Sequence, residues 1–391
     1  MHHQQKRIFI STGEVSGDLQ GALLIAALHR EADRRGMGLE ITALGGDRMA
    51  DAGANLLGNT SAIGSVGLLE SLPYIVPILS LQRRVKEVLK SSPPDAIVLI
   101  DYMGSNLNLG QYLRRVFPQV PIVYYIMPQC WVWSISDKNT QDIIEMSDRL
   151  LAIFPEEAKF FRDRQARVTW VGHPLVDAME TAPTREEARS RLQISSDAIA
   201  IALLPASRPQ ELKSLMPTIF AAAAEIQRQL PEVEFWIPLS LEAYRDKIET
   251  AIDRYGLRGK LVRDRDRTVL AAADFAIAKS GTVNLELAIL NVPQVVVYRV
   301  HPVTAWIARK LLGFSIPFMS PPNLVEMKAI VPELLQEEVT VENIVSRSLE
   351  LLPNTEKRQK MLADYEEMRQ VLGAVGGCDR AAREIFTLMK S

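Results

Sequence analysis

Short apolar runs alternate with segments of helical spacing along both halves of the chain, and this alternation limits the possible folds most strongly. The runs that read as strands cover residues 7–12, 40–44, 96–100, 121–126, 149–153, 198–204, 234–238, 275–279 and 294–300. Helical patterns follow most of them, for example at residues 18–30 and 215–229. Because parallel strands need a long crossover between them, this order predicts βαβ units and mostly parallel sheets.

The strand–helix pattern occurs twice, which predicts two domains. A chain of 391 residues also exceeds what a single core usually organises. The polar stretch near residues 172–185 is the expected linker. We predict an α/β protein with Rossmann-like, doubly wound domains over residues 1–175 and 176–355, followed by a charged helical segment over 356–391. The two domains are expected to face each other across a cleft in a GT-B-like arrangement, with ligands at the carboxyl ends of the strands.

Charge and cysteine content exclude several classes of protein. The 45 Lys and Arg residues nearly balance the 47 Asp and Glu residues, so no basic field would attract nucleic acid. Two cysteines, Cys130 and Cys378, are too few for a disulfide framework or a zinc cluster. We expect neither a signal peptide nor a transmembrane helix, and no resident metal or cofactor.

The sequence Gly-Glu-Val-Ser-Gly-Asp at residues 13–18 follows the first predicted strand and opens a helix. Small residues there let the backbone approach a ligand. Glu14 and Asp18 place negative charge where a pyrophosphate would bind, so we favour recognition of a hydroxyl-rich acceptor through Glu14, Ser16, Gly17 and Asp18. The alternative is a plain strand-to-helix turn in which Ser16 or Asp18 is the N-cap.

Two charged residues follow buried strands and are candidate catalytic groups. Asp101 ends the run at 96–100, where a carboxylate suits a general base that takes a proton from a hydroxyl. Arg208, next to Ser207, follows the run at 198–204 and suits bidentate hydrogen bonds to a departing diphosphate. The alternatives are a turn or cap role for Asp101 and a solvated side chain for Arg208.

The most specific local signal is a strand that ends in Ser280-Gly281-Thr282 and runs into a helix. Backbone N–H groups at a helix start suit a diphosphate, as do the hydroxyls of Ser280 and Thr282. Asn284 belongs to the same candidate site, and Glu286 suits hydrogen bonds from ribose hydroxyls. The alternative is an ordinary capping box that begins at Thr282.

The stretch from Ser61 to Leu81 is apolar, contains glycine and proline, and leads into Arg83 and Arg84. An apolar segment beside cations suits an anionic membrane surface and acyl chains. The alternative is a buried pair of helices.

Taken together, these motifs closely resemble the lipid-A-disaccharide synthase family over nearly the whole chain. The matching segments are GEVSGD at 13–18, GGDRM at 45–49, VGLLE at 66–70, WVW at 131–133, FPEE at 154–157, VGHPL at 171–175, LLPASR at 203–208, SGT at 280–282, PNL at 322–324 and VPELLQ at 331–336. Many ordered matches are far more specific than any single motif.

The resemblance implies an inverting GT-B glycosyltransferase that works without a bound metal. It would move 2,3-diacylglucosamine from UDP to the 6-hydroxyl of 2,3-diacylglucosamine 1-phosphate and form the β(1→6) lipid A disaccharide 1-phosphate and UDP. The N-terminal domain would bind the acceptor and the C-terminal domain the UDP-sugar. The resemblance also implies a cytoplasmic enzyme held peripherally on the inner membrane through Ser61 to Leu81, and a possible homodimer that exchanges its C-terminal segments.

By the same resemblance, Asp101 matches the proposed general base and Arg208 the essential arginine. Ser280, Gly281, Thr282 and Glu286 match the UDP-binding segment. The family's Asp-Ala-Pro-Asp-Phe-Asn is Asp-Tyr-Met-Gly-Ser-Asn at residues 101–106 here, so the second acid is lost and Asn106 remains on the acceptor side. Two alternatives stay open: a divergent UDP-sugar transferase with another acceptor, and a catalytically silent UDP-sugar-binding protein.

Overall fold

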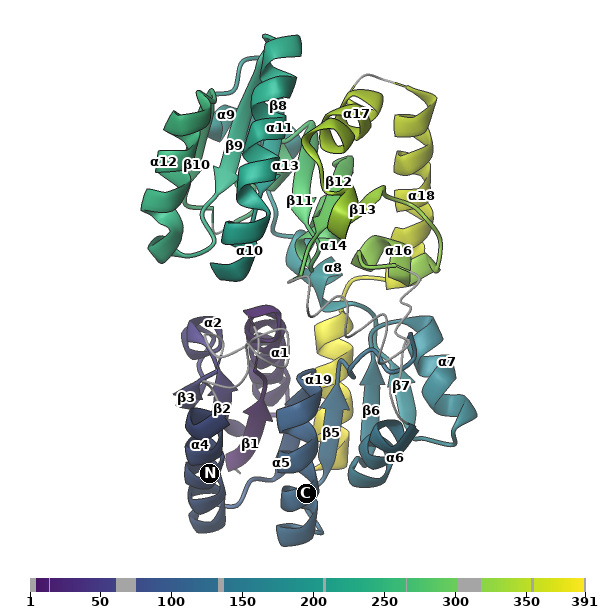
Figure 1. Cartoon of the computed structure of the whole chain (residues 1–391). Coiled ribbons are helices and arrows are strands. Elements are labelled where there is room, and N and C mark those ends of the chain that lie inside the picture. The colour runs from purple at the N-terminus through teal and green to yellow at the C-terminus, as the bar shows by residue number, and fades with distance from the viewer. Residues whose placement is uncertain are drawn as a thin grey trace. The chain divides into compact units, whose positions relative to one another are not determined.

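The computed structural model contains two compact units, which Figure 1 shows with all labelled elements. The first comprises Met1–Asp177 together with Leu372–Ser391, and the second comprises Ala178–Val371. The structure describes residues 5–13, 15–60, 75–132, 137–206, 209–264, 266–300, 318–352 and 355–389. Each unit is considered separately below.

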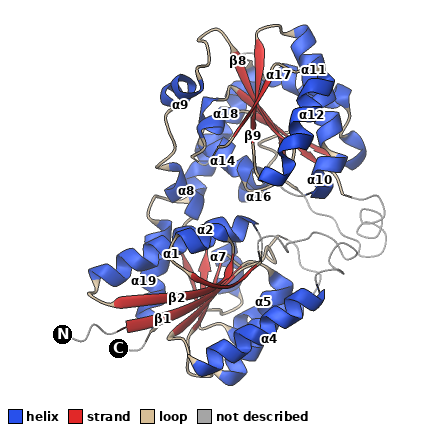
Figure 2. Cartoon of the chain, turned by 90° about the vertical axis from the view of Figure 1, so that its left-hand side faces the viewer, coloured by secondary structure: helices blue, strands red, loops and turns tan. Residues whose placement is uncertain are grey.

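The first unit is built on a parallel sheet with the strand order β3-β2-β1-β4-β5-β6-β7. Its strands are β1 (Gln5–Ser11), β2 (Gly38–Gly45), β3 (Asn55–Asn59), β4 (Ala96–Ile100), β5 (Ile122–Tyr125), β6 (Arg149–Ala152) and β7 (Val168–Trp170). Its helices are α1 (Val15–Arg34), α2 (Asp47–Asp51), α4 (Ile75–Ser91), α5 (Met103–Val116), α6 (Asp137–Met146), α7 (Pro155–Asp163) and α19 (Gly377–Leu388). Figure 2 shows α1 and α19 on one face of this sheet and α4 and α5 on the other.

The second unit contains a parallel sheet with the order β10-β9-β8-β11-β12-β13. Its strands are β8 (Ile199–Leu204), β9 (Val233–Pro238), β10 (Gly259–Val262), β11 (Phe275–Lys279), β12 (Gln294–Tyr298) and β13 (Glu333–Leu335). Its helices are α9 (Arg185–Leu192), α10 (Pro209–Ser214), α11 (Met216–Gln229), α12 (Arg245–Tyr255), α13 (Thr268–Ala272), α14 (Val283–Ile289), α16 (Pro321–Glu326), α17 (Val341–Leu351) and α18 (Glu356–Leu372), with short 3₁₀ turns η2 (Glu242–Tyr244) and η3 (Gln336–Glu338). The helix α8 (Pro174–Met179) spans the boundary between the units.

These two sheets confirm the predicted α/β class with two doubly wound, Rossmann-like folds. In each unit the first strand lies inside the sheet, and the chain adds strands to one side of it before it crosses to the other. The order therefore reverses between β1 and β4 in the first unit and between β8 and β11 in the second. Ligands of such folds bind beyond the carboxyl ends of the strands at this switch point.

The strands that the hydrophobic pattern did not predict are those at the edges of the sheets: β3 and β7 in the first unit and β10 and β13 in the second. Their residues are mostly half-buried or exposed, whereas every residue of β4 and β5 is buried. An edge strand covers less core and therefore needs no continuous apolar run.

The C-terminal segment forms two helices rather than one. Gly373 and Gly376 separate them with φ values of +89° and +92°, which glycine adopts at low cost. α19 packs on α1 of the same chain, where Arg30 pairs with Asp379 at 2.7 Å. Exchange of this segment between subunits stays a prediction. Among the described helices, none combines the length and apolar character needed to cross a membrane.

Candidate active site

Asp101 lies directly beyond β4, at the switch point of the first sheet, and its backbone is unusual. Its φ is +45° and that of Tyr102 is +52°, both in the left-handed region. Its N–H donates to the Ile126 carbonyl at 3.0 Å, and Ile126 itself has a φ of +58°. A left-handed residue typically costs about 1–2 kcal/mol, and aspartate adopts this conformation more readily than a tyrosine such as Tyr102. Strain of this kind collects at functional sites.

Asn106 is fully buried behind this turn. Its amide nitrogen donates to the carbonyls of Ser11, Ile100 and Asp101, and its oxygen accepts from the Ser11 hydroxyl at 2.8 Å. Ser11 ends β1 and Ile100 ends β4, so Asn106 ties together the two strands that flank the switch point. Both polar atoms of the Asn106 side chain are therefore hydrogen-bonded within the protein.

The other candidates at residues 13–18 have different surroundings. Gly17 packs against Thr12, where an added Cβ would lie 1.9 Å from the hydroxyl oxygen. Asp18 is buried and holds the start of α2, because its carboxylate accepts from the N–H groups of Gly46, Arg48 and Met49. Ser16 is half-buried in the first turn of α1. Glu14 lies outside the described residues.

Gly13 is required because the Tyr102 ring lies against it. An added Cβ would stand 2.1 Å from two ring carbons, far inside van der Waals contact. The glycine therefore makes room for Tyr102, which is part of the strained turn at Asp101.

We predict that Gly13→Ala lowers the free energy of unfolding by about 1–3 kcal/mol, the usual range for overpacking, and displaces Tyr102. Gly104→Ala is the matched control, since no atom lies within 4 Å of its added Cβ. Chemical denaturation of both variants tests this. Equal stability of the two variants would contradict the packing argument.

Glu157 is a second carboxyl group near Asp101 that the sequence analysis did not assign to the site. It is buried and accepts from the N–H of Ile153 at 2.7 Å, which ties α7 to the end of β6. Burial raises its pKa to about 8, and the charge of Asp101 acts in the same direction. The acidic residue at the N3 position of α7, after Pro155, is a capping-box signal that could have drawn attention to it.

His173 is structural, as a lone histidine more often is. It is buried, its ring packs on Phe154 at 5.2 Å, and Nδ1 accepts from the Leu175 N–H. Burial lowers its pKa to about 3, so it stays neutral at physiological pH.

We predict that raising the pH from 6.5 to 8 destabilises the protein through Glu157. In this range folded Glu157 keeps a proton that the unfolded chain has lost, because its pKa rises from 4.5 to about 8 on folding. The unfolded state binds fewer protons, so the free energy of unfolding falls as the pH rises, by roughly 2 kcal/mol over this range. His173 opposes this trend slightly, because it is neutral in the folded state while its unfolded form, with a pKa of 6.5, loses its remaining half-charge over this range.

Denaturant unfolding at several pH values measures this loss, and Glu157→Gln should flatten it. Glu156→Gln, at the exposed neighbouring position, is the matched control. An unchanged slope in Glu157→Gln would show that another group causes the loss.

In the second unit, the predicted segment lies at the carboxyl end of β11, beside the switch point with β8. The Ser280 hydroxyl donates to the Met319 carbonyl at 2.6 Å, and the Gly281 N–H donates to the side-chain oxygen of Asn284 at 2.7 Å. Asn284 is fully buried. Thr282 precedes α14, but its side chain makes no capping hydrogen bond, so the ordinary capping box does not form.

Charged side chains surround this segment. Glu286 pairs with Arg267 at 3.2 Å, and both side chains are largely buried. The Lys279 ammonium lies over Gly281, 2.7 Å from the position of an added Cβ, and pairs with Glu211 at 3.6 Å. Lys279 directly precedes the Ser-Gly-Thr motif but was not among the predicted site residues. Ser207 and Arg208 lie outside the described residues.

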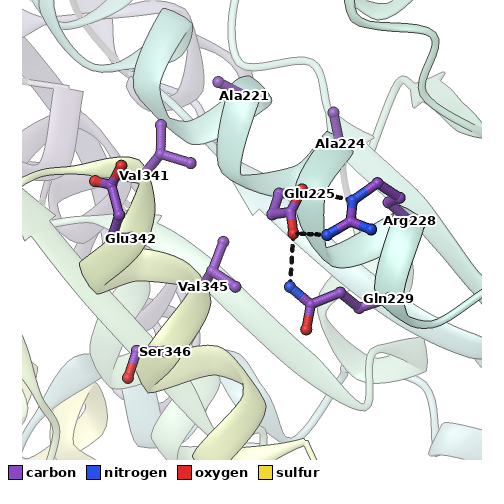
Figure 3. Close-up of a pocket in the computed structure, with 9 residues that line it drawn as sticks. All are labelled: Ala221, Ala224, Glu225, Arg228, Gln229, Val341, Glu342, Val345 and Ser346. Carbon is purple, nitrogen blue, oxygen red and sulfur yellow. Dashed lines mark hydrogen bonds and ion pairs between the residues drawn. The ribbon is translucent and has the colours of Figure 1, made fainter.

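A groove in the second unit lies away from the Ser280 turn. It has a volume of about 670 Å³ and runs between α11 and α17. Figure 3 shows Glu225 bonded to Arg228 and Gln229 on one wall, with Val341 and Val345 on the facing helix. Gln229 ends α11 shortly before β9 begins, so this groove lies toward the amino ends of the strands, away from the switch point. Within the described ranges, no cluster of three His, Cys, Asp or Glu side chains could hold a metal ion.

Comparison with solved structures shows the same fold in other proteins. A Staphylococcus aureus MnaA–UDP structure superposes with a TM-score of 0.65 at 14% identity and covers 99% of this chain and 98% of that one. MurG of Acinetobacter baumannii superposes with a TM-score of 0.58 at 14% identity, covering 98% and 99%. At this level of identity the likeness concerns the fold, and it agrees with the predicted GT-B class.

Sequence comparison is far more specific. The family profile described as lipid-A-disaccharide synthetase matches residues 8–384. The lipid-A-disaccharide synthase of Gloeothece citriformis is 59% identical over 380 residues, which cover 97% of this chain and 99% of the relative. That of Synechocystis is 52% identical over 382 residues, with 97% of each chain covered. The chain therefore belongs to the lipid-A-disaccharide synthase family and has that family's glycosyltransferase activity in lipid A biosynthesis, with lipid A precursors as its substrates.

Proposed function

We propose that the chain transfers 2,3-diacylglucosamine from UDP to the 6-hydroxyl of 2,3-diacylglucosamine 1-phosphate with inversion, and forms the β(1→6) lipid A disaccharide 1-phosphate and UDP. The observation that carries this proposal is the position of Asp101 in a strained turn at the switch point of the first sheet. Its carboxylate would take the proton from the 6-hydroxyl, and the acceptor oxygen would attack the anomeric carbon as the bond to UDP breaks.

The second unit would bind the donor through the turn at Ser280, Gly281 and Thr282. Lys279 supports this role because its ammonium lies against that turn, where the charge of a diphosphate would be placed. Ribose hydroxyls would donate to the Glu286 carboxylate, whose orientation is fixed by Arg267. Arg208, with Ser207, would hold the departing diphosphate, and no resident metal would be needed.

The first unit would bind the acceptor near Ser16, Gly17, Asp18 and Asn106, with Glu14 as a direct contact. Gly17, Asp18 and Asn106 are buried, so their part would be to shape the surface. The stretch from Ser61 to Leu81, most of which lies outside the described residues, would face the inner membrane from the cytoplasmic side. Exposed Arg83, Arg84 and Lys90 on α4 support this orientation, since anionic lipid attracts such cations. A homodimer with exchanged C-terminal segments belongs to the same proposal.

Turnover of UDP-2,3-diacylglucosamine with 2,3-diacylglucosamine 1-phosphate tests the proposal, with product followed by mass spectrometry. We expect disaccharide 1-phosphate and UDP in equal amounts, with the same rate in the presence of a chelator. The Tyr102 ring over Gly13 motivates a parallel assay with an unacylated acceptor. Exclusive use of that acceptor would favour a divergent transferase, and tight UDP binding in calorimetry without any product would favour a silent binding protein.

A further inference from the structure

Two buried side chains hold the main-chain carbonyl of Asp101. The Asn106 amide and the Tyr124 hydroxyl each donate to it at 2.8 Å, from α5 and β5 respectively. We propose that Tyr124 and Asn106 are positioning residues, which keep Asp101 in the left-handed conformation that sets the direction of its carboxylate. This inference rests on the proposed function, in which Asp101 is the general base.

Left-handed backbone at Asp101 and Tyr102 is less favourable than ordinary backbone, and the hydrogen bonds to the Asp101 carbonyl offset a cost of similar size. These bonds therefore decide the conformation of the turn, because leaving a buried partner unpaired is itself costly. Loss of either donor would therefore let the turn relax toward an ordinary conformation, which rotates the peptide and moves the side chain of Asp101.

Tyr124 is suited to this task. It is fully buried in the core of the first unit, so its ring fixes the position of the hydroxyl. Burial and the nearby charge of Asp101 raise the pKa of Tyr124 well above its usual value, so the hydroxyl remains a donor at any working pH. The bond crosses from β5 to the turn after β4.

Asn106 adds a link to β1. Its amide nitrogen donates to three carbonyls, which can only accept, so its orientation is fixed by its surroundings. Because it also accepts from the Ser11 hydroxyl, the turn at Asp101 is held to both strands of the switch point. A general base must be held in a fixed position, since a displacement of about 1 Å can lower a rate by roughly 10²-fold.

The neighbouring tyrosine provides a matched control. Tyr125 is equally buried on β5, but it follows Tyr124 and points to the opposite face of the sheet, where its hydroxyl lies near Cys378. Tyr124→Phe and Tyr125→Phe each remove one buried hydroxyl. The Tyr124 hydroxyl is hydrogen-bonded and the Tyr125 hydroxyl is not, so the two variants can differ in unfolding midpoint. A purely structural role would therefore change the midpoint of Tyr124→Phe without changing kcat well below that midpoint.

The experiment compares kcat and KM of these two variants, with unfolding midpoints measured alongside. We expect Tyr124→Phe to lower kcat by roughly 10-fold with KM for the UDP-sugar unchanged, as expected for loss of one hydrogen bond together with misplacement of the base. Tyr125→Phe should stay within about twofold of the unaltered protein. In single-turnover reactions, Tyr124→Phe should cause no further loss when Asp101 is already asparagine.

A second pair of variants tests the same inference if Tyr124→Phe does not fold. Asn106→Ala should lower kcat by at least 10-fold, whereas Asn108→Ala, at an exposed position on the same helix, should not. Equal kcat within either matched pair, or a loss from Tyr124→Phe that persists without the Asp101 carboxylate, would overturn the inference. Full activity of Asp101→Asn would instead refute the proposed general base.

Discussion

Asp101→Asn is expected to lower kcat by roughly 10²–10⁴-fold, the range that general-base catalysis supplies. Asparagine has nearly the same shape, so the hydrogen bonds to the main-chain carbonyl of Asp101 should remain. The KM for the UDP-sugar should change little, because the second unit holds the proposed donor site. Steady-state kinetics over a range of both substrates measures the effect.

Asp51→Asn is the control, because Asp51 is exposed at the end of α2. A second readout is independent of activity. The charge of Asp101 contributes to the raised pKa of Glu157, so Asp101→Asn should reduce the loss of stability between pH 6.5 and 8. Turnover within threefold of the unaltered protein would remove Asp101 from the mechanism.

Arg208→Ala is expected to lower kcat by roughly 10²–10³-fold, because a fixed cation stabilises the negative charge that develops on the departing UDP. Arg208→Lys should recover only part of this loss, since an ammonium cannot form the paired hydrogen bonds of a guanidinium. Rates of UDP release in single-turnover reactions test this expectation.

Arg228→Ala is the control for Arg208→Ala. Arg228 lies in the groove between α11 and α17, where it pairs with Glu225, far along the chain from the Ser280 turn. Its loss should leave kcat unchanged. Normal UDP release by Arg208→Ala would assign the stabilising charge to another group, with Lys279 as the first choice.

Central strands were predictable from the sequence because they are buried on both faces. β4 and β5 lie inside the first sheet, and every residue is apolar or aromatic. Asp101 could be chosen as a candidate for the same reason, because it is an acid that directly follows an apolar run. Edge strands such as β10 lacked this signal because solvent covers part of their surface.

The hydrogen-bond partners in the site could not be predicted, because they join distant segments. Tyr124 lies 23 residues from Asp101, and Asn106 lies 95 residues from Ser11. Asp18, predicted as a ligand contact or a local cap, accepts hydrogen bonds from the start of a helix that begins 29 residues later. Patterns within one segment contain no information about such pairings, which arise only when parallel strands align their ends.

The position of α19 has a consequence for biosynthesis. The N-terminal unit contains residues from both ends of the sequence, and α19 covers α1 only after all of the second unit has been made. After the first 177 residues have left the ribosome, part of α1 therefore stays exposed to solvent. It is covered only when α19, which begins at residue 377, has also been made. A nascent chain of this architecture depends on its last helix to complete its first domain.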